Sequence, residues 1–300
     1  MGASRLSLVS LFGYSLRRKY KSAGLSPKTI EVDAETTLHF WGPKPSSEST
    51  GKPPLLLIHG FGPSGIFQWQ HQIRPLSAHF DLYVPDLIFF GKSTTKSSER
   101  SEVFQAVSLG KLFDKLELKR FSVMGTSYGG MVAYHMASMW PERIEKVVIA
   151  SSAVNMVRKD EEETRERAKV ERIDELMLPS TAPQLRNLFR LAVFKPPSIL
   201  PNFLLNDLLS TLFNENREEK MELLKGLTIG SDDVAHVSPL QVEALIVWGE
   251  QDQIFPLKKA IDLKGLLGGK VELEILNNTS HVPQIEDPKQ FNAIVKKFLC

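Results

Sequence analysis

The chain has 300 residues, enough for one large domain or two small ones. Hydrophobic residues make up 42% and charged residues 24%, as in an ordinary globular protein. The formal net charge of +2 creates no global basic field, so nothing indicates a nucleic-acid partner. The single cysteine, Cys300, excludes an intrachain disulfide and fits a reducing compartment.

Residues 1–28 form a basic segment, with no acidic residue before Glu31. A composition rich in Arg and Ser and poor in acids is typical of an organelle transit peptide. An amphipathic helix packed on the domain, with its basic end in solvent, is the favoured interpretation of residues 1–28. No apolar run reaches the roughly 18 residues of a membrane span, so we expect no integral membrane segment and a cytoplasmic protein. Organelle targeting through the N-terminus is the alternative.

Short apolar runs alternate with helical patterns from residue 29 onward. Helices are predicted over residues 67–80 and 101–118, from Tyr128, and over 287–299. Strands are predicted at residues 37–42, 55–60, 81–87, 120–125, 146–151, 244–249 and 270–276. This alternation implies right-handed crossovers and a mostly parallel sheet with helices on both faces, so the predicted fold class is α/β.

Residues 155–236 interrupt the alternation. They begin with a highly charged stretch and continue with segments of helical apolar spacing, such as "PQLRNLFRLAVF", with few strand signals. A helical insertion between two strands of a sheet predicts a lid or cap. We therefore expect a core formed by residues 29–154 and 237–300, and a helical cap formed by residues 155–236.

The stretch "VMGTSYGGMVAY" places Ser127 between two glycines, where a predicted strand meets a predicted helix. Strand, G-x-S-x-G and helix in this order describe a sharp turn that exposes a serine hydroxyl. The helix that starts near Tyr128 points its free N–H groups at the same place, where they favour negative charge. Ser127 is therefore the candidate nucleophile.

A serine hydroxyl is a poor nucleophile unless a base removes its proton. Of seven histidines, His281 follows the last strand in a loop that can reach the carboxyl edge of the sheet, and His236 at the end of the cap is the alternative base. Asp252 directly follows a strand and precedes His281, which gives the chain order Ser, Asp, His. Glu250 is the runner-up acid.

A reaction at a carbonyl also needs donors for the developing oxyanion. One predicted donor is the backbone N–H of Tyr128, and the other is the N–H of Phe61 in the glycine-rich stretch "HGFG". His59 of that stretch is expected to brace the loop. No metal-ligand cluster and no dinucleotide-binding fingerprint occurs in the sequence, so no metal and no cofactor is expected.

The stretches "HGFG", "VPDLIFFGKS", "GTSYGGMVAY", "VWGEQDQIFP" and "SHVPQIEDP" together resemble the α/β-hydrolase superfamily from about residue 30 onward. Within it, the chain is similar to plant members that are esterases, lipase-like hydrolases or carbon–carbon bond hydrolases. The resemblance implies a triad of Ser127, Asp252 and His281 and a small-molecule ester or other acyl substrate.

The stretch "HGFGPSGIFQW" also resembles the oxyanion loop of hydrolases that split ring-fission products. Those enzymes have Asn before the nucleophile and Trp after the histidine, where this chain has Thr126 and Val282. Epoxide hydrolases carry Asp at the position of Ser127. The favoured function is therefore ester hydrolysis through an acyl-enzyme, ahead of carbon–carbon bond hydrolysis.

Two further alternatives keep the same residues. An acyltransferase would use the acyl-enzyme with an alcohol in place of water and would need a dry pocket, and a slow-turnover ligand receptor would retain the triad. Four aromatic residues of the cap are candidates to line such a pocket, although a purely structural role in the core is favoured: Phe189, Phe194, Phe203 and Phe213.

Overall fold

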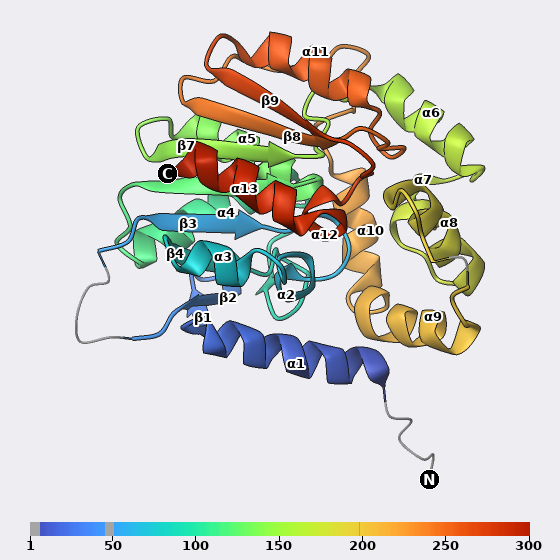
Figure 1. Cartoon of the computed structure of the whole chain (residues 1–300), viewed down its shortest axis with the longest axis horizontal. Helices are drawn as coiled ribbons and strands as arrows, with labels where there is room; N and C mark the ends of the chain where they lie inside the picture. Colours follow the sequence, from blue (N-terminus) through green and yellow to red (C-terminus); the bar gives the residue numbers. More distant parts are fainter. Residues whose placement is uncertain (1–6, 46–50, 198) are drawn as a thin grey trace.

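The computed structural model describes residues 7–45, 51–197 and 199–300. Residues 1–6, which include Arg5 of the predicted N-terminal segment, lie outside the described residues, as do residues 46–50. Figure 1 shows a central sheet with helices on both of its faces and a further group of helices at the end to which the strand arrows point.

The described strands form a single nine-stranded sheet in the spatial order β1-β2-β4-β3-β6-β7-β8-β9, with β5 paired to β2. Every neighbouring pair from β4 to β9 along this order is parallel, and the pairs that involve β2 are antiparallel. The prediction of a mostly parallel sheet is therefore confirmed. The strands are β1 Leu25–Glu31, β2 Thr36–Pro43, β3 Pro54–Ile58, β4 Asp81–Pro85, β5 Thr94–Thr95, β6 Phe121–Thr126, β7 Ile144–Ala150, β8 Glu243–Gly249 and β9 Val271–Leu276.

The central strands carry apolar side chains on both faces of the sheet, and helices bury both faces. In β3, Leu56 and Ile58 belong to the cluster under α4, α5 and α11, whereas Leu55 and Leu57 belong to the cluster under α1, α3 and α13. All four side chains are fully buried, each worth about 1.5–3 kcal/mol relative to exposure. The helices outside the β7–β8 connection are α1 Leu8–Ser22, α2 Gly65–Gln68, α3 Ile73–Ser77, α4 Glu102–Lys115, α5 Tyr128–Met139, α11 Leu257–Leu267, α12 Pro283–Glu286 and α13 Pro288–Leu299.

The single helix predicted over residues 67–80 is wrong, because the segment forms the short helices α2 and α3 with a turn between them. Pro75 explains the break. Proline has no N–H to donate and its ring clashes with the carbonyl four residues earlier, so it is tolerated in a first helical turn but not in the middle of a helix. Helix α3 begins at Ile73 and holds Pro75 in that first turn. His71 and His79 consequently lie in turns.

The connection between β7 and β8 is helical, and no strand occurs in its described part, residues 155–197 and 199–236. Its helices lie beside the edge to which the strand arrows point (Figure 1). Leu176 and Leu191 from this insertion share a buried cluster with Ile254, which follows β8. The insertion is thereby fixed over the carboxyl ends of the strands. Its elements are α6 Arg158–Ala168, α7 Ile173–Met177, α8 Ala182–Ala192, α9 Asn202–Leu208, the π-helix η1 Leu209–Phe213, and α10 Arg217–Lys225.

Helix α1 packs on the domain through one face. Its buried residues Val9, Gly13, Leu16 and Tyr20 recur every three or four positions, the spacing of one helical stripe. The Tyr20 hydroxyl donates a hydrogen bond to the carbonyl of Gly65 at 3.1 Å. In the described part of the chain, no helix combines the length and apolarity that crossing a membrane requires.

Candidate active site

Ser127 lies in a sharp turn between the end of β6 and the start of α5. Its backbone angles, φ 52° and ψ −124°, are strained for a residue with a side chain. The turn closes only because its neighbours are glycines: a Cβ on Gly125 would overlap the carbonyl of Gly129, and one on Gly129 would overlap the carbonyls of Ile58 and His59. The Ser127 N–H donates to the carbonyl of Ala150 on β7, which anchors the turn to the sheet.

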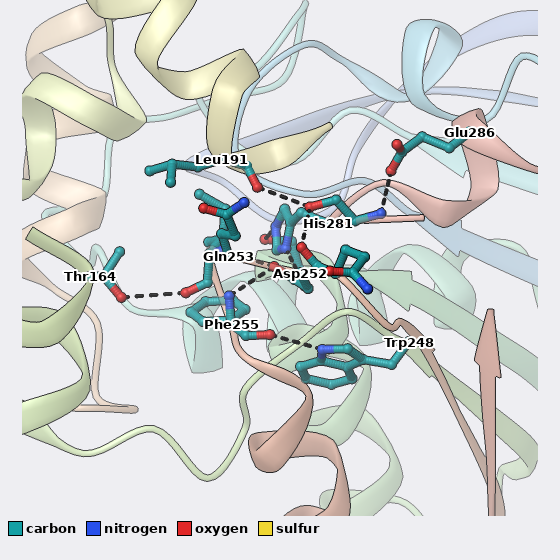
Figure 2. Close-up of polar contacts among 12 residues, drawn as sticks. Thr164, Leu191, Trp248, Asp252, Gln253, Phe255, His281 and Glu286 are labelled. Atoms are coloured by element: carbon teal, nitrogen blue, oxygen red, sulfur yellow. Dashed lines mark hydrogen bonds and ion pairs between the residues drawn. The ribbon is translucent and has the colours of Figure 1, made fainter. Parts of the chain in front are cut away.

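The structure brings the three residues predicted as a triad into one hydrogen-bonded chain. The Nε2 of His281 lies 3.0 Å from Oγ of Ser127, and its Nδ1 lies 2.9 Å from Oδ2 of Asp252. Figure 2 shows Asp252 beside the His281 ring. Ser127, Asp252 and His281 are 8%, 5% and 7% exposed, so little water competes for these contacts.

Asp252 is held by the loop that follows β8. Its Oδ1 accepts hydrogen bonds from the backbone N–H groups of Ile254 at 2.8 Å and Phe255 at 2.9 Å, which leaves Oδ2 for the imidazole. Both carboxyl oxygens of Asp252 therefore have hydrogen-bond partners, which fixes the orientation of the group. Glu250, the runner-up acid, is an exposed residue at the end of β8 and forms none of these bonds.

The loop that carries His281 is bonded to the C-terminal end of α8 in the insertion. The His281 N–H donates to the carbonyl of Ala192 at 3.1 Å, and the Ser280 hydroxyl donates to the carbonyl of Leu191 at 2.9 Å. Glu286 completes the link, because its two carboxyl oxygens accept the N–H groups of Ser280 and Phe194, each at 2.7 Å. Burial raises the pKa of Glu286, partly offset by these hydrogen bonds.

Sequence reasoning did not single out Glu286. The residue belongs to the stretch "SHVPQIEDP", but its position in the sequence does not indicate that its carboxylate joins Ser280 to Phe194, which is about ninety residues away from Glu286 in the chain. Its partners are backbone groups, which leave no trace in the identity of the residues that carry them.

The residues that carry the predicted oxyanion donors, Phe61 and Tyr128, border the same cavity as Ser127. Tyr128 is the first residue of α5, where N–H groups have no acceptor within the helix. Phe61 stands in the loop after β3, with its ring edge-on to the ring of Tyr128 at 5.8 Å. Gln68 shapes this loop, because its Oε1 accepts the Gly60 N–H at 2.8 Å and its Nε2 donates to the carbonyl of Pro63 at 2.8 Å. Gln68 was also missed by sequence reasoning.

The other histidines discussed above lie elsewhere. His59 is buried, its Nδ1 lies 2.8 Å from the carbonyl of Gly60, and its Nε2 accepts the Leu87 N–H at 2.9 Å, as a bracing residue would. Burial lowers the pKa of His59, so the neutral ring that this geometry requires is favoured. His236 has a side chain that is 76% exposed and pairs with Asp232 at 3.0 Å. It does not contact Ser127.

Two apolar cavities meet at Ser127. The larger, of about 370 Å³, extends under α8 and η1 and is bordered by His281 and Val282. The smaller, of about 70 Å³, extends toward Met131 and Met156. Of the four phenylalanines that the sequence suggested for a pocket, Phe189 and Phe213 line the larger cavity. Phe194 and Phe203 do not, and Phe203 is 67% exposed. No three His, Cys, Asp or Glu side chains among the described residues are placed to hold a metal ion.

Comparison with known families identifies this arrangement. The family model described as alpha/beta hydrolase fold matches residues 53–288, most of the chain. The chain belongs to this family. The resemblance to the α/β-hydrolase superfamily drawn from the sequence is confirmed, whereas the similarity to plant members stays a prediction.

Similar proteins include two kinds of hydrolase. A 2-hydroxy-6-oxononadienedioate/2-hydroxy-6-oxononatrienedioate hydrolase of Pseudomonas putida is 26% identical over 256 residues, covering 83% of this chain and 88% of that protein. A carboxylesterase of Bacillus subtilis matches with a TM-score of 0.71 and 22% identity, over 97% of this chain and 98% of that one. A 2-hydroxy-6-oxo-6-phenylhexa-2,4-dienoate hydrolase of Rhodococcus matches with a TM-score of 0.73 and 20% identity, over 91% and 98% of the two chains.

Proposed function

We propose that this hydrolase is a serine esterase that cleaves a neutral, mainly apolar carboxylic ester through an acyl-enzyme. The observation that carries the proposal is the chain Ser127–His281–Asp252, with contacts of 3.0 and 2.9 Å, at the meeting point of two apolar cavities. In this proposal residues 155–236 are a cap over the site, and residues 29–154 and 237–300 are the core that carries it.

The geometry supports a two-step reaction. Nε2 of His281 takes the proton of Ser127 as Oγ attacks the ester carbonyl, and Nδ1–H donates to Asp252, which stabilises the imidazolium. The N–H groups of Phe61 and Tyr128 bind the oxyanion. The imidazolium then protonates the leaving alcohol, and a water activated by the same ring hydrolyses the acyl-enzyme.

The lining of the two cavities favours an ester over a ring-fission product. The substrates that name the Pseudomonas and Rhodococcus hydrolases are carboxylates, which need cationic partners when they are buried. No Lys or Arg lies among the described residues that border either cavity. Thr126 and Val282, which replace the Asn and Trp expected of a ring-fission enzyme, both border the larger cavity.

The sizes of the cavities favour an asymmetric substrate. A cavity of about 370 Å³ is within the usual range for a small ligand, whereas about 70 Å³ holds only a few heavy atoms. We therefore expect an ester with one medium-sized apolar group and one small group, rather than an ester with two bulky groups.

A panel of 4-nitrophenyl esters with acyl chains from acetate to laurate, together with methyl esters of the same acids, tests this function. We expect multiple turnovers with an optimum at a medium chain, and at least tenfold slower cleavage when the acyl chain ends in a carboxylate. A preference for the carboxylate-bearing ester, or for a dienoate carbon–carbon substrate, would contradict the proposal. A single slow turnover would favour the receptor alternative, and faster product formation with added alcohol would favour acyl transfer.

A further inference from the structure

A separate cavity lies behind the oxyanion loop, apart from the two that Ser127 borders. It measures about 480 Å³ and is bordered by α1, the loops that follow β3 and β4, and the η1–α10 part of the insertion. Gly62, Phe67 and Leu212 border both this cavity and the larger cavity at Ser127, so they form the wall between the two. Nothing in the proposed ester chemistry uses this space.

Lys220 of α10 borders this separate cavity and is only 2% exposed. Its ammonium lies 4.8 Å from the centre of the Phe90 ring, and no hydrogen bond or ion pair joins it to another described residue. Burial lowers the pKa of Lys220, although Glu215 and Glu219 oppose that shift. A buried ammonium without a charged partner costs free energy unless a ligand completes its contacts.

The other groups around the cavity give it a positive excess. Arg17, Lys21 and Lys92 border it together with Lys220. The two acids at its border are Glu215 and Asp86, and Asp86 already contacts Nδ1 of His39 at 2.9 Å and accepts the Lys92 N–H at 3.3 Å. Four cations and two acids therefore border the cavity, and Asp86 already has partners of its own. The remaining lining includes an apolar part formed by Val9, Trp41, Ile66, Phe67, Phe90 and Leu212.

We propose that this cavity is a second binding site, distinct from the ester-cleaving one, for a small amphipathic carboxylate whose charged end contacts Lys220. The apolar body lies against Phe67 and Leu212, on the far side of the wall that the ester site also uses. The ligand also rests on Phe90, whose ring meets the ring of Phe61 edge-on at 5.3 Å. A bound ligand would thus contact Phe90, which supports Phe61 in the oxyanion loop.

Octanoate and the uncharged octan-1-ol are matched probes, titrated by calorimetry into the full-length protein. Lys220→Met should weaken octanoate binding at least tenfold and leave octanol binding unchanged, because only the charged contact is lost. Lys220→Arg should keep octanoate affinity within about threefold. Lys225→Met is the control, since Lys225 lies on the same helix with a side chain 66% exposed and pairs only with surface Glu222.

The inference also makes a prediction about the ligand-free protein. Replacing an unpaired buried ammonium by an apolar side chain of similar length should leave the melting temperature equal to that of the wild type or higher. A Lys220→Met variant that melts lower or does not fold would show that the ammonium has a structural partner and would overturn the inference. Unchanged octanoate affinity in that variant would also overturn it, because Lys220 does not border the cavity at Ser127. These results do not depend on whether Ser127 cleaves esters.

Discussion

Ser127 and His281 are 3.0 Å apart, yet they are held by different parts of the molecule. Ser127 is fixed within the core, through the glycines of its turn, a hydrogen bond to Ala150 of β7 and N–H groups in the first turn of α5, which its carbonyl accepts. His281 stands on a loop whose backbone and neighbours are bonded to Ala192 and to Phe194 in the insertion. The position of the proposed nucleophile is thus a property of the core. The position of the proposed base depends on the helices above it as well as on the core loop after β8, to which Thr279 and Ser280 are bonded.

Ser127 and His281 should therefore respond differently to substitutions in the insertion. A strained turn inside a packed sheet has one arrangement, because its alternatives would break backbone contacts on three strands. A loop tied by a few hydrogen bonds to a separate group of helices moves when those helices move. Substitutions in the insertion should therefore alter proton transfer before they alter the turn at Ser127.

The largest effect is expected from Ser127→Ala, which removes the group that attacks the ester. We expect kcat to fall by about 10³ or more with normal folding, since triads lose that much when the nucleophile is removed. Esterase assays and fluorophosphonate labelling measure the two consequences. Labelling of a different serine in the variant would contradict the assignment.

Asp252→Asn should come next, with kcat lower by about 10² to 10⁴, because an amide favours the wrong tautomer of the ring and cannot stabilise the imidazolium. Glu250→Gln is the matched control, a neighbouring acid whose side chain is exposed. Its activity should stay within about twofold of the wild type. If the two variants exchanged their effects, the acid would be Glu250.

Glu286→Ala tests the dependence of the base on the insertion. Losing the carboxylate frees the N–H groups of Ser280 and Phe194, and we expect kcat to fall about tenfold with a smaller change in KM. Glu286 acts here as a positioning residue, so amide hydrogen exchange at Ser280 and His281 should speed up while exchange at Ser127 stays slow. If amide exchange rose equally at His281 and at Ser127, the position of His281 would depend on the insertion no more than that of Ser127 does.

Glu286→Gln is the accompanying conservative variant. It retains one carbonyl acceptor but presents an NH₂ group to the second N–H, so it should recover part of the lost activity. Activity equal to that of Glu286→Ala would indicate that both acceptor oxygens are needed together.

The smallest effect on activity is expected from Asp33→Asn, a change far from both residues. A hydrogen bond from Lys111 lowers the pKa of Asp33 to about 2, and the N–H groups of Glu35 and Thr36 add to the shift. The ionised group therefore stabilises the fold above its ordinary pKa of 3.8, and this contribution is lost as the pH falls from there through about 2. Denaturation between pH 2 and 7 should show a loss on the order of 1 kcal/mol near neutral pH in the variant and a flatter acid dependence, with unchanged kcat.

The sequence predicted those parts of the site that are encoded by recognisable patterns of neighbouring residues. The turn at Ser127 follows from glycines adjacent in the chain, and the order Ser127, Asp252, His281 follows from strands whose apolar runs are easy to recognise. Gln68 and Glu286 were missed because each acts on backbone N–H and C=O groups, which every residue carries. The break between α2 and α3 was missed because the apolar spacing continues through Pro75, although the ring of that residue forbids a continuous helix.

The packing of helix α1 determines what proteolytic removal of the N-terminal segment would do to the fold. If a processing protease removed residues up to Ser22 as a targeting sequence, the cut would also remove Tyr20, which is fully buried edge-on against Trp41 at 5.3 Å. The carbonyl of Gly65 would lose the Tyr20 hydroxyl and keep only the Trp69 N–H as a donor, and apolar surface around Ile66 would meet water. The buried face of α1 is therefore packed into the same apolar cluster as Trp41 and Ile66, and removal of residues 8–22 would expose that cluster.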